Sequence, residues 1–305
     1  MYHEIARNRR KSVLVVVFFF LFWIGAGYGI GLLAGGGDVG SGIGGAVVAG
    51  ILASLAVLYA FAFGRATILA VSGAKPVTRE QAPQLYDIVE TLATGDGLPM
   101  PQVYVINDPS PNAFATGLSP KSAAITVTSG LLQTMNREEL EGVIGHEMSH
   151  IKNFDVRLIL IVGTVVAMAG LLASIAWRSL FYTRLGNNRD SGYALLVLVG
   201  VAVLFSIIAI IVGPIMQFAL SRSRESLADA SSVELTRNPA GLLHALQKIA
   251  NNDKPFAKMT HVTAAMCIDN PLEHHTAWYH HLYDTHPPIE ERIAALEKML
   301  EVRET

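Results

Sequence analysis

Two histidines stand four residues apart in the segment His146-Glu147-Met148-Ser149-His150. On a helix, this spacing places both imidazole rings on one face, one turn apart. Two imidazoles presented in this way can bind one Zn²⁺ at about 2.0–2.1 Å each. Glu147 follows the first histidine directly, where its carboxylate can serve as general base toward a water whose pKa the metal lowers. The alternative interpretation is two surface histidines on an ordinary helix.

A catalytic zinc needs a third protein ligand, and a chain with one cysteine must supply it from histidine or carboxylate side chains. Glu225 and Asp229 are also spaced by one helical turn. A carboxylate from this segment would complete a His₂Glu set, and Asp229 would then be placed to accept the N–H of a ligand imidazole, His146 being the favoured partner. The alternative is that the charged side chains of this segment only pair with one another, namely Arg222, Arg224, Glu225 and Asp229.

A helix that could carry the paired histidines is indicated just upstream. Asn136 and Glu139 have the spacing of a capping box, in which each side chain bonds the backbone N–H of the other residue. Leu140, Val143 and Ile144 follow on one face. The pattern therefore predicts a helix that begins after Asn136 and includes the motif.

Short elements before this helix predict a small sheet beside it. Residues Thr78 to Thr94 are expected to form an amphipathic helix, with Leu85, Ile88, Val89 and Leu92 at helical spacing. Val103 to Ile106 and Ala124 to Thr128 are short, β-branched and bounded by Pro, Gly, Asn and Ser, which is typical of strands.

Charge is excluded from much of the chain. Only 16% of the 305 residues are charged, whereas about a quarter are charged in a typical soluble domain. Four runs contain no Asp, Glu, Lys or Arg: residues 12–37, 39–64, 158–177 and 191–221. Each is long enough to cross about 30 Å of hydrocarbon as a helix. The third run is only just long enough and the fourth contains Pro214, so these two could instead form a hairpin that dips into the bilayer.

Basic residues predict the orientation. Four precede the first run, which places the N-terminus and the parts after the second and fourth runs in the cytoplasm. The first run is longer than the apolar core of a signal peptide, so we interpret it as a retained anchor. Arg178, Arg184 and Arg189 fit poorly in an outside loop, which also favours incomplete crossing of the second hairpin.

Several motifs in the same order resemble the HtpX family of membrane-bound zinc metalloproteases, which is related to the type I CAAX prenyl proteases. They are the His-Glu-Met-Ser-His segment, a hydrophobic hairpin, the segment 221–229, and two further stretches, 112–117 and 284–292. The resemblance covers nearly the whole chain. One departure is Ser226, where an aromatic residue is more usual, and we expect it to change packing and not ligation.

The resemblance implies a fold and a division of the chain. The expected fold is an α+β membrane protein, mainly α, with four hydrophobic helices and a cytoplasmic zincin-like catalytic domain that contains a small β-sheet. Residues 1–72 would form the first transmembrane hairpin and residues 157–220 the second. The catalytic domain would consist of residues 73–156 and 221–305, split by the second hairpin.

The resemblance also implies roles for site residues. One Zn²⁺ per chain would be held by His146, His150 and Glu225, with Glu147 catalytic and Asp229 orienting a ligand.

Further residues would meet the substrate. His286 and Arg292 would come close to the zinc, where donors can stabilise the negative charge that develops on the former carbonyl oxygen. Asn112, Ala113 and Phe114 would lie along the bound peptide, which would add as an extended strand. Without the resemblance, the favoured interpretation of His286 is a turn residue before two prolines.

The expected substrates are membrane proteins or unfolded polypeptides, cut near the bilayer face, with membrane-protein quality control as the role that the resemblance implies. The lipid bilayer is the other expected partner. Nucleic acid is not expected as a partner, because net charge is −2 and no basic block with interleaved aromatic residues occurs. One rival function is a CAAX-type prenyl-protein endopeptidase. Such an enzyme would need a large chamber within the membrane, and four spans are too few to enclose one. Another is a membrane scaffold with structural zinc, which would not need Glu147.

Overall fold

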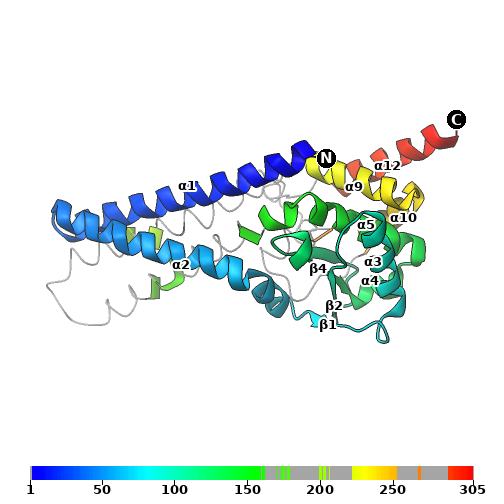
Figure 1. Ribbon diagram of the computed structural model, residues 1–305, viewed down its shortest axis with the longest axis horizontal. Coiled ribbons are helices and arrows are strands. Elements are labelled where there is room, and N and C mark those ends of the chain that lie inside the picture. Colours follow the sequence, from blue (N-terminus) through cyan, green and yellow to red (C-terminus); the bar gives the residue numbers. More distant parts are fainter. Residues whose placement is uncertain are drawn as a thin grey trace. The chain divides into compact units, whose positions relative to one another are not determined.

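The computed structural model describes residues 2–158, 222–252, 267–268 and 288–304, with short stretches between residues 160 and 206 (160–161, 170, 173–175, 177–178, 199–200, 202–203 and 206). The chain divides into two compact units (Figure 1). The αβ unit contains Gly64–Leu160 and the described residues from Arg222 onward, and the helical unit contains Arg10–Phe63 and the described residues from Ile161 to Ser206. The fold is mostly helical, with one small mixed sheet among the described residues.

The sheet of the αβ unit has the order β1-β2-β4-β3. β2 and β4 run parallel, while β1 pairs with β2 and β3 pairs with β4 in the antiparallel sense. The two predicted strands are confirmed as β2 and β4, and the bounds of the four strands are Lys75–Pro76 (β1), Gln102–Ile106 (β2), Ala113–Thr116 (β3) and Ala124–Thr128 (β4).

Alternate residues of the strands face a helical layer. Val103, Ile125 and Val127 lie on the same face as Ala113 and join the main hydrophobic core. The helices that contribute to this core include α3 (Pro83–Gly95), α5 (Arg137–Lys152) and α10 (Pro239–Ala250). Other described helical elements of this unit include η1 (Pro120–Ser122), α4 (Ser129–Thr134), α9 (Arg222–Thr236) and α12 (Ile289–Glu304).

The amphipathic helix predicted from Thr78 begins later than expected. α3 starts at Pro83, and the four residues predicted for its apolar face, Leu85, Ile88, Val89 and Leu92, are all buried. The early start was wrong because a proline disfavours helical backbone at the preceding residue, here Ala82, and favours the first helical turn for itself.

α5 and α9 cross closely because small residues lie between them. A Cβ on Gly145 would lie 2.7 Å from Ser232 Oγ on α9, so a larger residue would push the helices apart. The Ser232 hydroxyl donates to the carbonyl of Gly142 at 2.6 Å. This crossing brings the segment that carries Glu225 against the helix that carries the paired histidines.

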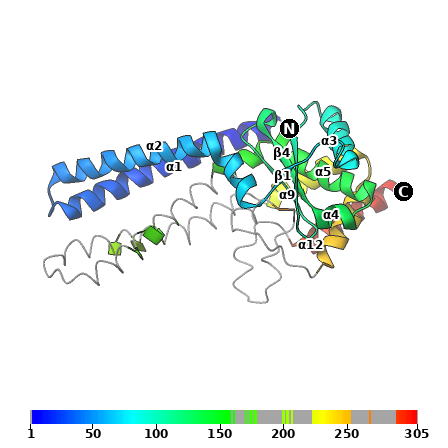
Figure 2. The same cartoon turned by 90° about the horizontal axis from the view of Figure 1, so that it is seen from below.

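The helical unit contains most of the hairpin of α1 (Tyr2–Ala34) and α2 (Val39–Val71), which lie side by side in Figures 1 and 2. A Cβ on Gly27 would lie 2.5 Å from the carbonyl oxygen of Gly45, so glycine allows the two backbones to approach. Val16–Ala34 and Val39–Val71 are long and apolar enough to cross a membrane.

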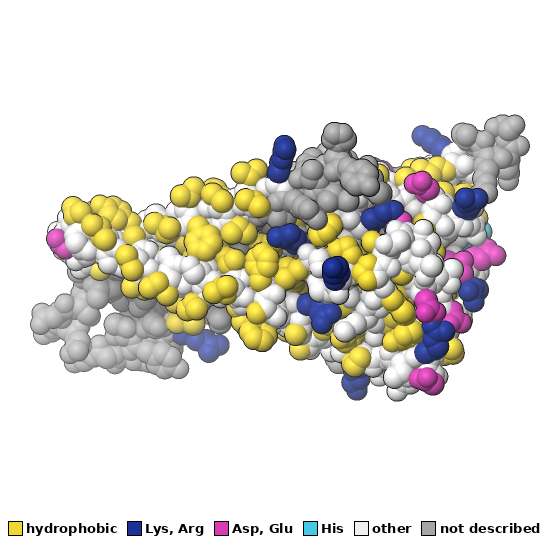
Figure 3. Space-filling view, in the orientation of Figure 1, with side chains coloured by type: hydrophobic (Ala, Val, Ile, Leu, Met, Phe, Trp, Pro, Cys, Tyr) yellow, Lys and Arg dark blue, Asp and Glu magenta, His cyan; other side chains and the backbone are white. Residues whose placement is uncertain are grey.

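Hydrophobic side chains cover most of these two helices on the face shown in Figure 3. Many of them are exposed, as lipid-facing residues would be.

The third and fourth uncharged runs lie mostly outside the described residues, so the prediction of four hydrophobic helices is met for two of them. One described contact joins the third and fourth runs: Trp177 Nε1 donates to Ser206 Oγ at 3.0 Å. Leu158 and Leu160, at the start of the third run, are buried in the αβ unit.

Candidate metal centre

The helix that carries the motif begins as predicted. Asn136 Oδ1 accepts the N–H of Glu139 at 2.9 Å, and the N–H of Asn136 donates to Glu139 Oε2 at 2.8 Å, which confirms the capping box. The buried Glu139 carboxylate also accepts from Lys248 Nζ at 2.7 Å, so the box is tied to α10. The start of α5, and with it the orientation of its histidines, is therefore well defined.

His146, His150 and Glu225 meet in the interior of the αβ unit. Their potential ligand atoms all lie within 4.8 Å of one another. The two Nε2 atoms are 3.1 Å apart, and Glu225 Oε2 and Oε1 lie 3.4 Å and 3.5 Å from Nε2 of His146 and His150 respectively. All three residues are buried.

These separations fit a tetrahedral zinc ion. Ligand atoms at about 2.0–2.1 Å from a tetrahedral centre stand about 3.3 Å apart. The two Nε2 atoms are 3.1 Å apart, and each has a Glu225 oxygen at 3.4 or 3.5 Å, so the nearest separations between ligand groups lie close to this value. Two imidazoles and one carboxylate also form the ligand set of several catalytic zinc sites, which leave a fourth position for water.

Asp229 lies behind His146, one turn along α9 from Glu225. Its Oδ1 is 2.8 Å from His146 Nδ1, on the side of the ring opposite Nε2. This contact fixes the tautomer in which Nδ1 carries the proton, so that the Nε2 lone pair faces the cluster. This contact is compatible with the orienting role that the resemblance implies for Asp229, which stays a prediction.

Arg292 contacts Asp229 and not the Nε2 side of the ring. Its Nε and Nη2 donate to the two carboxylate oxygens of Asp229 at 2.9 and 2.7 Å, and its Nη1 donates to the carbonyl of Ile268 at 2.9 Å. Nη2 lies 3.3 Å from His146 Nδ1, but both atoms carry hydrogens, so this is proximity and not a hydrogen bond. These contacts suit a residue that positions Asp229, and the predicted catalytic role of Arg292 stays a prediction.

Asp155 is a site residue that the sequence did not reveal. Its Oδ2 lies 3.0 Å from His150 Nδ1, so the second imidazole also has a carboxylate behind it. On a continued helix, Asp155 would point about 140° away from His150. The helix instead ends at Lys152, and Phe154 has a φ of 61°, a left-handed conformation that turns the chain back.

The carboxylates shift the acid–base balance of the two rings. Burial and Arg292 lower the pKa of His146, but the hydrogen bonds that its ring donates to Asp229 and Glu225 outweigh them and raise the pKa to about 9. Burial likewise opposes the shift at His150, whose pKa is raised by Glu225 and Asp155. Burial raises the pKa of Asp229, but Arg292 and His146 outweigh burial and hold this pKa well below its usual range. The cluster therefore favours positive charge between the rings, which suits a divalent cation.

Of the predicted catalytic residues Glu147 and His286, the structure describes only Glu147. Glu147 follows His146 on α5 and is buried, with 1% of its surface exposed. His286 lies outside the described residues, so its predicted approach to the metal stays a prediction.

The predicted substrate residues lie at the start of β3. Asn112 Oδ1 accepts the N–H of Ala113 at 2.9 Å, and Asn112 and Phe114 are buried. The carbonyl of Ala113 accepts the N–H of Ile268 at 3.0 Å, and Phe114 forms a bridge with Cys267. At Ala113 and Phe114 the outer edge of β3 is therefore paired with residues 267–268 of the same chain. The role of these residues in binding substrate stays a prediction.

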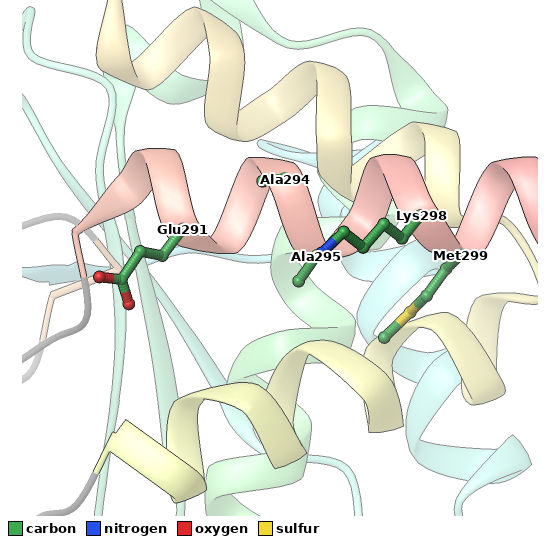
Figure 4. A pocket seen from close by; sticks show the side chains of 5 residues that line it. All are labelled: Glu291, Ala294, Ala295, Lys298 and Met299. Carbon is green, nitrogen blue, oxygen red and sulfur yellow. The ribbon is translucent and has the colours of Figure 1, made fainter.

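A surface hollow along α12 is separate from the metal cluster (Figure 4). Its described lining contains none of the residues discussed above as ligands or orienting groups, and consists of Glu291, Ala294, Ala295, Lys298 and Met299. We assign no part of the chemistry to it.

Comparison with known proteins places this centre in a family. Residues 79–300 match peptidase family M48, and the chain belongs to that family. It is 42% identical to the protease HtpX homolog of Listeria monocytogenes serotype 4a (strain HCC23), over 98% of this chain and 100% of that protein. It is 44% identical to the protease HtpX homolog of Ligilactobacillus salivarius (strain UCC118), with the same coverage.

A solved structure is also similar. Ste24p of S. mikatae is 21% identical, with a TM-score of 0.48, and the match covers 81% of this chain and 57% of that one. The family and the full-length relatives define the chain as a metalloprotease, a hydrolase. The two apolar helices together with these relatives make it a membrane protein.

Proposed function

We propose that this chain is a zinc-dependent endopeptidase of the cell membrane that cuts membrane proteins or their cytoplasmic segments. The observation that carries the proposal is the meeting of His146, His150 and Glu225, at separations that fit one zinc ion per chain. These residues come from two parts of the sequence on either side of a hydrophobic segment. Membership of the metallopeptidase family supports the metal.

The chemistry divides between the metal and the protein. Zinc held by the three side chains would supply a Lewis acid for the scissile carbonyl and lower the pKa of the attacking water. Glu147 would take the proton from this water and deliver it to the leaving amine. Asp229 and Asp155 hold the N–H groups of the two imidazoles, so that both Nε2 atoms stay turned toward the ligand position.

The position of the ligands along the chain favours membrane-borne substrates. His150 precedes the third uncharged run by eight residues, roughly 12 Å if helical. Leu158 and Leu160 at the start of that run are buried in the αβ unit, which also contains the metal cluster. We therefore propose that residues 73–156 and 221–305 form one cytoplasmic domain, tethered to the bilayer by the hairpins 1–72 and 157–220. Removal of damaged membrane proteins is the role that suits such an enzyme.

The test of the mechanism is the replacement Glu147→Gln in the purified, zinc-loaded chain. We expect zinc content to be unchanged and peptide-bond hydrolysis to fall by a factor of about 10²–10⁴, the usual contribution of a general base. Cleavage at the wild-type rate would contradict the mechanism. A wild-type chain that binds zinc and cleaves no polypeptide would favour a structural role for the metal.

The test of the substrate class compares two chains with the same cleavable sequence. One is soluble and unfolded, and the other is anchored by a transmembrane helix in the same liposomes as the enzyme. We expect faster cleavage of the anchored chain. A consistent preference for the soluble chain in liposomes and in detergent would contradict the proposal.

A further inference from the structure

A buried ion pair lies behind the second imidazole of the metal cluster. Arg224 Nη1 donates to Asp155 Oδ1 at 3.0 Å, while the other carboxylate oxygen, Oδ2, faces His150 Nδ1 at 3.0 Å. The side chains of Arg224 and Asp155 are 3% and 4% exposed. One carboxylate thus joins a guanidinium to a candidate ligand.

This ion pair joins the two chain segments that carry the candidate ligands. Asp155 follows the end of α5 closely, and Arg224 directly precedes Glu225 on α9. The two residues are 69 positions apart in the sequence. Between them the chain leaves α5 and returns in α9, so the pair fastens the segments together beside the ligands themselves.

Stability alone is a weak explanation for such a pair. Desolvation of two buried charges costs several kcal/mol per ion, and apolar side chains of similar volume often stabilise a fold equally well. A guanidinium and a carboxylate do, however, hold each other in a fixed geometry. Phe154 has a left-handed backbone, which is uncommon and unfavourable for an aromatic residue. This conformation turns Asp155 toward His150, so the chain accepts local strain where the contact is made.

The first imidazole has the same arrangement. Asp229 joins Arg292 to His146 in the way that Asp155 joins Arg224 to His150. Each candidate ligand imidazole therefore has a carboxylate behind it, and each carboxylate has a buried guanidinium behind it.

We propose that Asp155 and Arg224 are positioning residues of the metal centre. Asp155 holds the Nδ1–H of His150, so that Nε2 faces the ligand position. Arg224 holds Asp155 and, as the neighbour of Glu225 in α9, sets the third ligand against the imidazole pair. This inference rests on the proposed zinc site and assigns these two residues to it.

The experiment measures zinc affinity, which a purely structural pair would leave unchanged. Asp155→Asn, Arg224→Met and the double variant are purified in detergent as full-length chains, and zinc is titrated against a competing chelator at fixed pH. The absorption spectrum of Co²⁺ in the same site reports ligand geometry, and the melting temperature of the metal-free chain reports stability separately.

A second ion pair near the end of α5 provides the matched control. Lys152 pairs with Asp96 at the end of α3, and neither residue touches a candidate ligand in the described contacts. Asp96→Asn therefore removes a more exposed ion pair, with side chains 25% and 12% exposed, at the same end of α5 without touching Asp155 or Arg224.

We expect Asp155→Asn and Arg224→Met each to weaken zinc binding by about 10–100-fold and to change the Co²⁺ spectrum, as replacement of groups behind metal ligands does. The double variant should lose less than the product of the two factors, because both act through one contact. Arg224→Lys, which keeps the charge, should recover affinity relative to Arg224→Met, and it serves as the second variant if Asp155→Asn does not fold. Asp96→Asn should bind zinc as the wild type does.

Two results would overturn the inference in different ways. Wild-type zinc affinity and an unchanged Co²⁺ spectrum in both variants, with only a lower melting temperature, would make Asp155–Arg224 a structural tie. A wild-type chain that binds no zinc would overturn the proposed function, and this inference with it.

Discussion

At the scale of single residues, the centre depends on buried charges that are arranged in series. Each imidazole contacts an aspartate, and each aspartate contacts an arginine. Such charges are costly to bury, and the loss of one partner leaves the other in a low-dielectric interior without compensation. The arrangement therefore has a stability signature that can be separated from catalysis.

Arg292→Met should show this signature. The variant removes the guanidinium that donates to both oxygens of the Asp229 carboxylate, so we expect the free energy of unfolding to fall by about 3–5 kcal/mol. Arg292→Met combined with Asp229→Asn should be less destabilised than Arg292→Met alone, because a neutral amide needs no cation. Urea unfolding of the metal-free chains, followed by circular dichroism, measures both. Equal stability of the single and double variants would contradict this interpretation.

At the scale of elements, the sequence predicted the parts with strong local signals. The capping box defined the start of α5 because both of its bonds are local. β2 and β4 were predicted because they are short and β-branched, and the apolar face of α3 was predicted from its period. The start of α3 was misplaced because the apolar period gave no sign that the helix begins only at Pro83.

The residues of the candidate site also fall into those that a local sequence pattern reveals and those that it does not. His146, Glu147 and His150 could be recognised because one helix carries them, and Glu225 with Asp229 because another does. Asp155 could not, because its approach to His150 depends on a left-handed residue after the end of α5. Arg224 was seen only as a charged neighbour of Glu225, since its partner lies on a distant segment.

Close packing of α5 against α10 gives a prediction at this scale. A Cβ on Gly142 would lie 2.6 Å from the backbone nitrogen of Leu242, which cannot move without moving α10. We expect Gly142→Ala to lower the free energy of unfolding by about 1–3 kcal/mol, despite the higher helix propensity of alanine. Thermal or urea unfolding measures the change.

Gly95→Ala in α3 is the matched control. Its nearest neighbour would be a side-chain carbon of Leu235 at 3.4 Å, which can adjust, so we expect stability within about 1 kcal/mol of the wild type. Equal losses in the two variants would show that the contact with Leu242 is not the cause.

At the scale of the whole molecule, the chain combines two apolar helices with the αβ unit, which is built from segments before and after the third and fourth uncharged runs. α1 and α2 each contain a stretch that is apolar and long enough to cross a bilayer. The basic residues before the first run predict a cytoplasmic N-terminus, and the turn between these helices would then lie outside. The residues after α2 would then return to the cytoplasm with the metal centre.

Cysteine labelling tests this orientation. In a Cys267→Ala background, Asp38→Cys places a thiol in the turn between α1 and α2, and Glu80→Cys places one on the exposed surface before α3. We expect a membrane-impermeant maleimide to label Asp38→Cys from the outside of intact spheroplasts, and Glu80→Cys only after lysis. Labelling of Glu80→Cys in intact spheroplasts, with Asp38→Cys labelled only after lysis, would show that the αβ unit faces outward.

X-ray absorption at the zinc edge of the purified chain tests the metal centre most directly. With His146, His150 and Glu225 as ligands, the spectrum should show two imidazole nitrogens and carboxylate or water oxygens at about 2.0–2.2 Å, and Glu225→Ala should change the first coordination shell. A sulfur ligand at about 2.3 Å, or an identical spectrum for Glu225→Ala, would contradict the assignment of the metal to these three side chains.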